Sequence, residues 1–404
     1  MTRRAGPLEI VVAGAGPVGL LFAWRLARES RASGVGIRIV DAKAPAGWQA
    51  QRIDPRVYAL SREAQCLLGD LWQTMAARRV CPYRRMRVWE GDAPEGSAAI
   101  TFDAAEIAEP DLGHIVEDSL IRSVLLDDLA RADVRIGFGV GVEAVRAERG
   151  AVSIRFSDGT AATVDLVVGA DGGESKVRAA AGIDAVRKDY RQRAVVTHVA
   201  SEKPHGETAW QRFLPEGPLA FLPLADGQSS IVWTSSEARA AELLAAGDEA
   251  FVDALQTASA GVLGRLGPCA ERLAFPLRLS HAIRYTRPGV ALIGDAAHAV
   301  HPLAGQGMNL GMRDAAVLGD VLVEAIERGE YPGDERVLRR YERRQKAHNL
   351  GMQLAFDGLN ELFGRRAPPW VAPVRGLGLA CFDRLAPAKR ILMRRALGLD
   401  RALA

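Results

Sequence analysis

Cysteine is scarce in this chain of 404 residues. The four cysteines, Cys66, Cys81, Cys269 and Cys381, show neither the paired spacing of a zinc site nor a redox CxxC motif. We therefore expect no disulfide framework and no bound metal. A reducing cytoplasm fits this cysteine usage best.

Long apolar runs and a strong net charge are also missing. No window approaches the ~20 consecutive apolar residues that a membrane-spanning helix needs. The first residues lead directly into a predicted strand, without the apolar stretch and cleavage site of a secretory signal. Lysine and arginine number 52 against 49 aspartates and glutamates, an excess too small to indicate nucleic-acid binding. The composition predicts a globular, cytoplasmic protein that is long enough for two domains.

Buried strands and helices alternate in the first part of the chain. Residues 9–13 and 37–41 have the pattern of short buried strands, and residues 18–29 between them have helical spacing. This order and length are typical of a parallel strand–helix–strand crossover. A further buried strand is expected within 163–172, and the same style returns at 289–296 before a long helix. The first lobe is therefore predicted to be discontinuous in sequence.

The middle of the chain has a different pattern. Longer amphipathic strands predominate there, interrupted by one helical segment at about 237–257, which predicts a mostly antiparallel sheet. We predict an α/β protein, α+β overall, in which a Rossmann-like lobe comprises 1–184 and 286–350. The inserted sheet lobe is assigned to 185–285 and a basic, helical C-terminal segment to 351–404. The first part of the Rossmann-like lobe is expected to contribute some elements to the inserted lobe.

A glycine-rich motif follows the first predicted strand. Gly14, Gly16 and Gly19 form a GxGxxG pattern that opens a helix. Gly14 permits the tight turn, Gly16 lets the backbone approach a pyrophosphate, and Gly19 lets the helix pack on the strand. Asp41 ends the second strand, 22 residues after Gly19, where a carboxylate can accept hydrogen bonds from a ribose. A second loose match at 139–144 is followed by alternating strand residues, so we interpret it as a turn.

Two more glycine-rich bends follow buried strands. Asp171 and Gly172 stand at the end of the strand within 163–172, just before a short predicted helix. Gly294 and Asp295 end the strand of the second part, and an irregular loop then leads to a helix. Such a loop places Asp295 against polyol hydroxyls. The N-terminus of the helix would point at a developing anion, such as the pyrimidine edge of a reduced flavin.

Together these motifs carry a family resemblance. The chain resembles the single-component flavin aromatic hydroxylases of the p-hydroxybenzoate hydroxylase superfamily, and among them the ubiquinone-biosynthesis ring hydroxylases (UbiH-type). The most specific stretch is the glycine-rich run 301–314, and residues 54–61 and 113–117 also match. Residues 211–224 are similar to strands of the family's substrate lobe. The resemblance covers about residues 8–350.

The resemblance implies that the Rossmann-like lobe binds FAD. The implied cofactor-binding residues are Gly14, Gly16, Gly19, Asp41, Arg56, Asp171, Gly172, Gly294, Asp295, Gly307, Met308 and Asn309. The glycines of the first motif would hold the pyrophosphate, Asp41 the adenosine ribose, and Arg56 would lie near the phosphates. The Asp171 motif would serve both FAD and the nicotinamide donor, Asp295 the ribityl chain, and residues 307–309 the isoalloxazine edge.

One position departs from the family pattern. Asp118 follows the Ile-Val-Glu motif, where the family commonly has asparagine. A carboxylate there could repel an anionic reduced flavin, or it could be neutral or turned away.

The strands of the inserted lobe suggest a substrate pocket. Aromatic residues on strands are usually core residues. Because side chains alternate along a strand, however, one face of the sheet must contact something other than that core. If that face meets the flavin, it would line an apolar pocket. The candidates for this pocket are Gln211, Phe213, Phe221, Trp233 and Pro302.

The implied activity is that of an FAD-dependent monooxygenase. NADH or NADPH would reduce FAD, and a flavin C4a-hydroperoxide formed with O₂ would hydroxylate a phenolic ring. No catalytic side chain is assigned, because the flavin carries the chemistry and an activated phenol directs the attack. The expected substrate is a lipophilic, prenylated phenol of ubiquinone biosynthesis. Another phenolic metabolite is the alternative.

Two further functions were weighed. A flavin disulfide reductase or dehydrogenase usually shows a second dinucleotide motif or a CxxC, and this chain has neither. A non-catalytic FAD-fold scaffold of a biosynthetic complex is disfavoured by the intact motifs. The tail after Arg365 is basic and interleaved with apolar residues, which is typical of a solvated helix face. Contact with other quinone-biosynthesis proteins, or peripheral contact at the inner face of the membrane, is the alternative interpretation.

Overall fold

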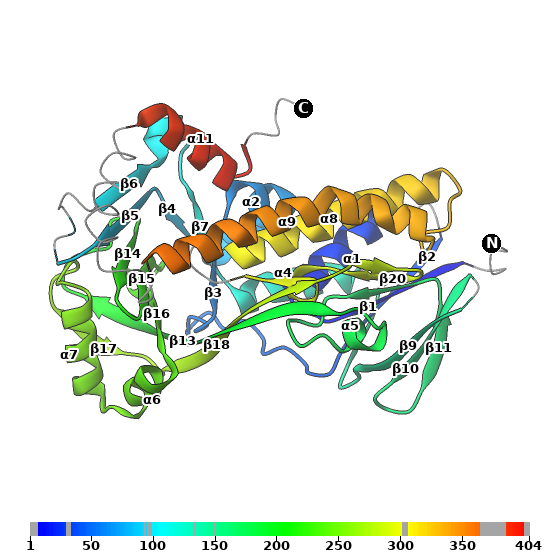
Figure 1. Ribbon diagram of the computed structural model, residues 1–404, viewed down its shortest axis with the longest axis horizontal. Helices are drawn as coiled ribbons and strands as arrows, with labels where there is room; N and C mark the ends of the chain where they lie inside the picture. The colour runs from blue at the N-terminus through cyan, green and yellow to red at the C-terminus, as the bar shows by residue number, and fades with distance from the viewer. Residues whose placement is uncertain are drawn as a thin grey trace.

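A parallel sheet forms the centre of the first lobe (Figure 1). The computed structural model describes residues 7–29, 34–92, 94, 99–132, 134–148, 150–300, 306–363 and 385–399. The strands in spatial order are β19 (Thr286–Arg287), β20 (Val290–Leu292), β12 (Leu166–Gly169), β1 (Leu8–Ala13), β2 (Val35–Asp41) and β8 (Arg135–Phe138). Only the β19–β20 pair of this sheet is antiparallel. Parallel order requires crossovers, and these bring the carboxyl ends of β1, β2, β12 and β20 to one edge.

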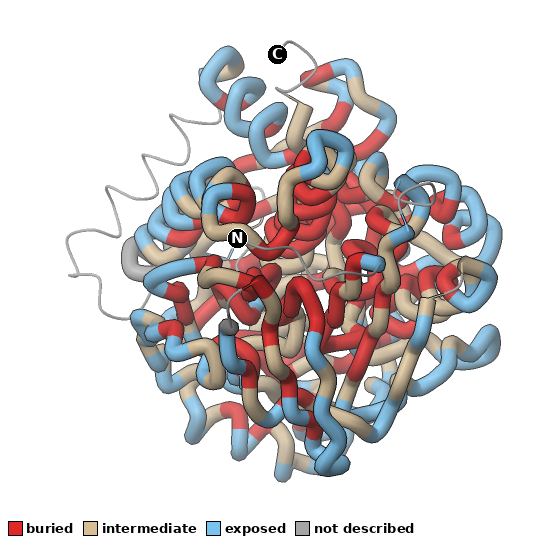
Figure 2. Tube along the Cα trace, turned by 90° about the vertical axis from the view of Figure 1, so that its right-hand side faces the viewer, coloured by how far each residue is buried: buried red, intermediate tan, exposed pale blue. Residues whose placement is uncertain are grey.

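Three long helices pack on one another beside this sheet. They are α1 (Pro17–Glu29), α4 (Asp118–Leu129) and α8 (Gln306–Glu327), with α9 (Glu335–Phe363) lying along α8. A small sheet of β9 (Val142–Glu148), β10 (Ala151–Phe156) and β11 (Ala161–Val164) joins the same hydrophobic core. Figure 2 shows these buried segments gathered in the interior, beneath exposed loops and helix faces. Burial of this apolar surface supplies the main driving force for folding the lobe.

The second lobe is built on a nine-stranded sheet. Its strands are β21 (His298–Ala299), β18 (Leu273–Ala282), β13 (Ala185–Ser201), β16 (Ser229–Ser236), β15 (Gly217–Pro223), β14 (Thr208–Leu214), β5 (Arg85–Glu90) and β6 (Ala99–Asp103), with β17 (Leu266–Cys269) paired to β13. All these pairs are antiparallel except β14–β5. The helices α6 (Glu237–Ala245) and α7 (Asp248–Ala258) join one face of the sheet in a separate core cluster.

Short elements fill the space between the two lobes. A three-stranded sheet of β3 (Val57–Leu60), β7 (Gly113–Glu117) and β4 (Cys81–Tyr83) is accompanied by α2 (Arg62–Leu67) and α3 (Leu71–Arg78). Elsewhere in the described part of the chain, the remaining helices are η1 (Ala104–Ile107), α5 (Lys176–Ala180), η2 (Gly294–Ala296) and α11 (Ala386–Ala396). α11 packs on η1.

The structure corrects two of the predicted elements. The single strand expected within 163–172 is two strands, because β11 belongs to the small antiparallel sheet and β12 to the central sheet. Asp165 stands between them, where its carboxylate and backbone N–H bind the backbone of Glu9. The helix expected at about 237–257 is interrupted before Asp248, where Gly247 is extended and serves as the N-cap of α7.

Candidate functional site

A cavity of about 690 Å³ lies where the two large sheets meet. The central sheet contributes the carboxyl ends of β1, β2 and β20, while β13, β14, β15, β16 and β18 contribute one face of the nine-stranded sheet. Open parallel sheets bind ligands at this edge, because the loops and helix N-termini converge there. Within the described residues, no cluster of His, Cys, Asp or Glu could hold a metal ion.

The glycines of the first motif divide into structural and ligand-facing positions. Gly14 has φ +111°, and a Cβ placed on it would lie 2.2 Å from the carbonyl oxygen of Ala170. A Cβ on Gly19 would lie 2.2 Å from the carbonyl oxygen of Gly14, so helix α1 can approach the turn only without a side chain. A Cβ on Gly16 meets nothing within 4 Å, although Gly16 borders the cavity. No packing contact within the described protein therefore requires glycine at position 16, and the space beside it is open to a ligand.

Asp41 secures this turn and faces the cavity. One carboxylate oxygen accepts a hydrogen bond from Ala15 N at 2.7 Å, and the other accepts one from Lys43 N at 2.9 Å. Each oxygen retains acceptor capacity, because a carboxylate has about four acceptor positions. Asp41 lines the cavity, as the predicted ribose contact requires.

Asp171 occupies a bend at the same edge. Its carboxylate accepts hydrogen bonds from Ser175 Oγ at 2.5 Å, Lys176 N at 2.7 Å and Val177 N at 3.1 Å. Asp171 and Ser175 therefore cap α5 together, since the Ser175 hydroxyl accepts from the backbone of the helix. Asp171 and Gly172 both line the cavity, and Gly172 has φ +82°.

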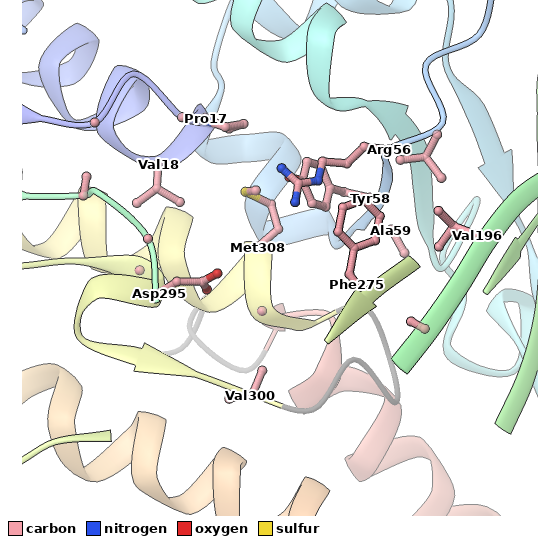
Figure 3. Close-up of a pocket in the computed structure, with 18 of the residues that line it drawn as sticks. Pro17, Val18, Arg56, Tyr58, Ala59, Val196, Phe275, Asp295, Val300 and Met308 are labelled. Atoms are coloured by element: carbon pink, nitrogen blue, oxygen red, sulfur yellow. The ribbon is translucent and has the colours of Figure 1, made fainter. Parts of the chain in front are cut away.

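Asp295 and Arg56 project into the cavity from opposite sides (Figure 3). Neither side chain has a hydrogen-bond or ion-pair partner among the described residues, although the Arg56 guanidinium lies 5.2 Å from the centre of the Phe275 ring. Burial raises the pKa of Asp295, while the charges of His298 and Arg56 oppose that shift. Both side chains are surrounded by protein but exposed to the space of the cavity, so their charges are available to a polar ligand that fills it. These two side chains are thus the strongest sign of a polar ligand.

A buried network positions Asp295. Asp314 on α8 is 0% exposed, and its carboxylate accepts hydrogen bonds from Gly294 N at 3.0 Å and Asn349 Nδ2 at 2.9 Å. His298 Nε2 lies 2.5 Å from the same carboxylate. Burial lowers the pKa of His298, but the charge and hydrogen bond of Asp314 outweigh it and hold the pKa above its ordinary value. Asp314 therefore anchors the backbone of Gly294 and the side chain of His298, which lie on either side of Asp295 in the sequence.

A second network positions Arg56. Arg79 donates to the carbonyl oxygens of residues 49, 50 and 52 and forms a pair with the buried carboxylate of Glu117. Glu117 also accepts from Asp54 N at 2.6 Å, and Asp54 in turn accepts from Arg56 N at 2.9 Å. The loop before β3 is thereby held in one place. The sequence analysis assigned no role to Arg79.

Residues 307–309 lie at the start of α8. Gly307 and Met308 line the cavity, whereas Asn309 does not. The Asn309 carboxamide accepts from Ser61 N at 3.0 Å and donates to Ala59 O at 3.0 Å and Gln306 Oε1 at 3.2 Å. Its side chain thus joins α8 to β3, whose Ala59 lines the cavity. Asn309 acts on the site through Ala59.

Asp118 does not line the cavity, and two cavity residues stand beside it. Tyr58 donates its hydroxyl to Asp118 Oδ1 at 2.9 Å, and Arg122 Nε lies 2.8 Å from Asp118 Oδ2. Burial raises the pKa of Tyr58, so its hydroxyl remains a donor. The departure from the family pattern is therefore accompanied by a cation four residues along α4. The i, i+4 spacing of Asp118 and Arg122 is a signal in the sequence that indicates such a pair.

The substrate-pocket candidates are only partly brought together. Gln211 lines the cavity, whereas Phe221 and Trp233 are buried in the core cluster with α6 and α7. Their strand neighbours Ala220 and Val232 line the cavity instead, so these two aromatics lie on the other sheet face. Phe213 shares the face of Gln211 but does not line the cavity. Pro302 lies outside the described residues.

The residues present fit FAD on structural grounds. The open space at Gly16, the unpartnered Asp295 and Arg56, and the acceptor capacity of Asp41 match a pyrophosphate, a polyol and a ribose. Ten of the twelve cofactor residues proposed from the sequence line the cavity, where one elongated ligand can reach them all. Gly19 instead permits close helix packing, and Asn309 hydrogen-bonds to Ala59, which lines the cavity.

Comparison with known proteins agrees with this geometry. The FAD binding domain family matches residues 7–354. The chain is 37% identical to 3-demethoxyubiquinol 3-hydroxylase of Escherichia coli (strain K12), covering 97% of this chain and 99% of the relative. It is 36% identical to ubiquinone hydroxylase UbiL of Rhodospirillum rubrum, covering 96% of this chain and 89% of the relative.

Solved structures confirm the expected fold class. Para-nitrophenol 4-monooxygenase PnpA of Pseudomonas putida DLL-E4 superposes with a TM-score of 0.80 at 19% identity, over 98% of this chain and 99% of that chain. Klebsiella pneumoniae HpxO, solved with FAD and uric acid, superposes with a TM-score of 0.74 at 19% identity, over 96% of each chain. At such identities these likenesses establish the fold alone. Together with the family match and the curated relatives, they show that this chain belongs to the FAD binding domain family, among the FAD-dependent monooxygenases related to ubiquinone hydroxylases.

Proposed function

We propose that this protein hydroxylates the ring of a lipophilic, prenylated phenol in ubiquinone biosynthesis, with NADH or NADPH as electron donor and O₂ as oxidant. The observation that carries the proposal is the two-sided cavity. Its central-sheet side has the polar groups that fit FAD, and its nine-stranded-sheet side is mainly apolar. The curated relatives named as ubiquinone hydroxylases, matched over nearly their full length, support the choice of ring substrate.

The side chains of the site would bind and orient FAD and the substrate, and they would exclude water. FAD, when bound, supplies hydride acceptance and oxygen activation. Asp295 would accept hydrogen bonds from the polyol chain, and Arg56 would place a positive charge beside the cofactor. Val196, Ala220 and Val232 present apolar side chains to the cavity and would keep water from the reacting ring. The positive end of α8, which begins at Gln306, would stabilise negative charge on the cofactor.

The proposed function predicts that substrate controls oxidation of the nicotinamide. We expect NAD(P)H oxidation by the FAD-loaded protein to be slow alone and at least ~10-fold faster with a suitable prenylated phenol, because closure around substrate commonly precedes reduction. The measurement is NAD(P)H absorbance with and without each phenol of a panel, together with H₂O₂ release. Equal rates with and without every phenol, with all electrons recovered as H₂O₂, would indicate an oxidase. Absence of any FAD-dependent oxidation would favour the scaffold interpretation.

We propose, in addition, that α11 meets an anionic membrane surface. Ile391 and Leu392 are 53% and 48% exposed, and exposed arginines flank them at 390, 394 and 395. The other face of α11 buries Met393 in a cluster that includes two cavity residues, Tyr83 and Met86. An apolar ridge with basic neighbours is typical of helices that lie in the membrane interface. In the described part of the chain no helix is both long and apolar enough to cross a bilayer.

The membrane proposal predicts weaker liposome binding by a double variant. Ile391→Gln with Leu392→Gln removes the exposed apolar pair but leaves Met393 packed, so FAD content and thermal stability should not change. We expect binding to vesicles that contain anionic lipid to fall several-fold, and added salt to weaken wild-type binding through screening over ~10 Å. Co-sedimentation measures both effects, with neutral vesicles as the control. Binding that is absent, or equal in the two proteins, would leave α11 as a solvated helix.

A further inference from the structure

The apolar wall of the cavity contains one aligned row of side chains. Gln211 on β14 is paired with Ala220 on β15, Ala220 with Val232 on β16, and Val232 with Val196 on β13. All four residues line the cavity. Directly paired residues on one sheet face stand side by side. The row is therefore a continuous strip of small apolar side chains with one carboxamide beside it.

The carboxamide of Gln211 is the polar group of this row. Gln211 is only 7% exposed, yet neither its oxygen nor its nitrogen forms a hydrogen bond with any described residue. On its far side the row continues to Val88 of β5, which offers no polar side chain. The polar atoms of the carboxamide are not fully buried, so they are open to the cavity. A ligand that filled the cavity without offering a partner would bury the carboxamide unsatisfied, which costs free energy. The cavity is the direction in which a partner could be met.

A carboxamide matches the oxygen substituents of a phenol. Its NH₂ group donates to a hydroxyl, methoxy or carbonyl oxygen, and its oxygen accepts from a phenolic hydroxyl. Two other polar side chains reach the same wall, Ser230 and Thr234, but each stands two residues along the strand from Val232 and outside this row. The strip of alanine and valine beside Gln211 leaves room for a flat ring, whereas Trp210, Phe221 and Trp233 pack on the other face of the sheet.

We propose that Gln211 recognises an oxygen substituent of the phenolic substrate and thereby sets the position of the ring along the Ala220–Val232–Val196 strip. This inference rests on the proposed function, since it names a contact within the same substrate site. Gln211 acts in binding and orientation, and it transfers no proton. A ligand that lacks the oxygen would leave the carboxamide buried and unsatisfied, so recognition would select against it.

The test compares two probes in the FAD-loaded protein without nicotinamide. The probes are a short-chain prenylated phenol and the same compound with hydrogen in place of the hydroxyl group. Gln211→Met keeps the length of the side chain and removes the hydrogen bond, and Thr234→Val serves as the matched control on the same wall. Calorimetry gives the affinity of each probe, and flavin absorbance gives the FAD content of each variant.

We expect the wild type to prefer the phenol about 10-fold, as one net hydrogen bond of ~1.4 kcal/mol gives. Gln211→Met should bind both probes with nearly equal affinity and retain its FAD, while Thr234→Val keeps the preference. In turnover, Gln211→Met should also divert more electrons to H₂O₂, because the ring is no longer positioned. A preference that survives in Gln211→Met, or a loss of FAD from that variant, would overturn the inference. Failure of the wild type to bind or hydroxylate any phenol would overturn the proposed function itself.

Discussion

The Gly16→Val variant is expected to fold like the wild type and to be purified without FAD. A Cβ at Gly16 meets nothing within 4 Å, so the valine has room in the protein. It would instead fill the space through which backbone N–H groups reach a pyrophosphate. Two hydrogen bonds to a charged phosphate, at about 1.5–3 kcal/mol each, correspond to at least ~100-fold in affinity. The measurements are flavin absorbance after reconstitution and the unfolding midpoint of the protein stripped of cofactor.

Gly19→Ala is the matched control for this prediction. A Cβ there would lie 2.2 Å from the carbonyl oxygen of Gly14, so the variant should lower the unfolding midpoint even without cofactor. The two variants together would show that Gly16 faces the ligand and that Gly19 is needed for packing. A Gly16→Val protein that retains a full complement of FAD would refute the placement of the pyrophosphate.

Asp314→Asn is expected to destabilise the protein strongly and to weaken FAD binding. Asp314 accepts hydrogen bonds from Gly294 N and Asn349 Nδ2 and pairs with buried His298. The NH₂ group of an asparagine at this position would face groups that are themselves hydrogen-bond donors, such as Gly294 N or Asn349 Nδ2. Breaking a buried pair of this kind costs about 3–5 kcal/mol in free energy of unfolding. Urea unfolding measures the stability, and titration with FAD measures the effect transmitted to Asp295 through Gly294.

The pH dependence of stability separates the ion pair from simple packing. Because Asp314 raises the pKa of His298 in the folded protein, the stabilising contribution of the pair is fully present below about pH 6.5, the ordinary pKa of histidine. It is lost as the pH rises through the raised value. The difference in unfolding free energy between the wild type and His298→Gln should therefore shrink at alkaline pH. A difference that is constant from pH 5 to pH 9 would mean that His298 contributes by packing alone.

The nucleotide side of the site was readable from the sequence because its signals are local. Gly14, Gly16 and Asp41 belong to one strand–helix–strand unit, and the structure places the three at one turn. Asp295 was found in the same way, since it lies in the short turn η2 just beyond the buried strand β20. In each case the chemistry needs a backbone conformation or a carboxylate at a strand end. Both features depend on a few consecutive residues, so they can be recognised in the sequence.

The substrate side was not readable in the same way. Alternation along a strand shows that two faces exist, but it does not say which face meets the cavity and which meets α6 and α7. Phe221 and Trp233 face the helices, so the small residues Ala220 and Val232 form the wall. Hydrogen-bond partners that are distant in the sequence could not be predicted either. Nothing near Asp314 in the sequence indicates Asn349, which α9 brings from 35 residues away.

The most direct test of the central claim is the origin of the oxygen in the product. The FAD-loaded protein would be supplied with NAD(P)H, a prenylated phenol and ¹⁸O₂, and the product examined by mass spectrometry. Ring hydroxylation by activated oxygen predicts one ¹⁸O atom in each molecule of hydroxylated product, and none when ¹⁸O is supplied only as water. A hydroxylated product without ¹⁸O from O₂, or oxidation of NAD(P)H with no hydroxylated product from any phenol, would contradict the assignment of this cavity to monooxygenation.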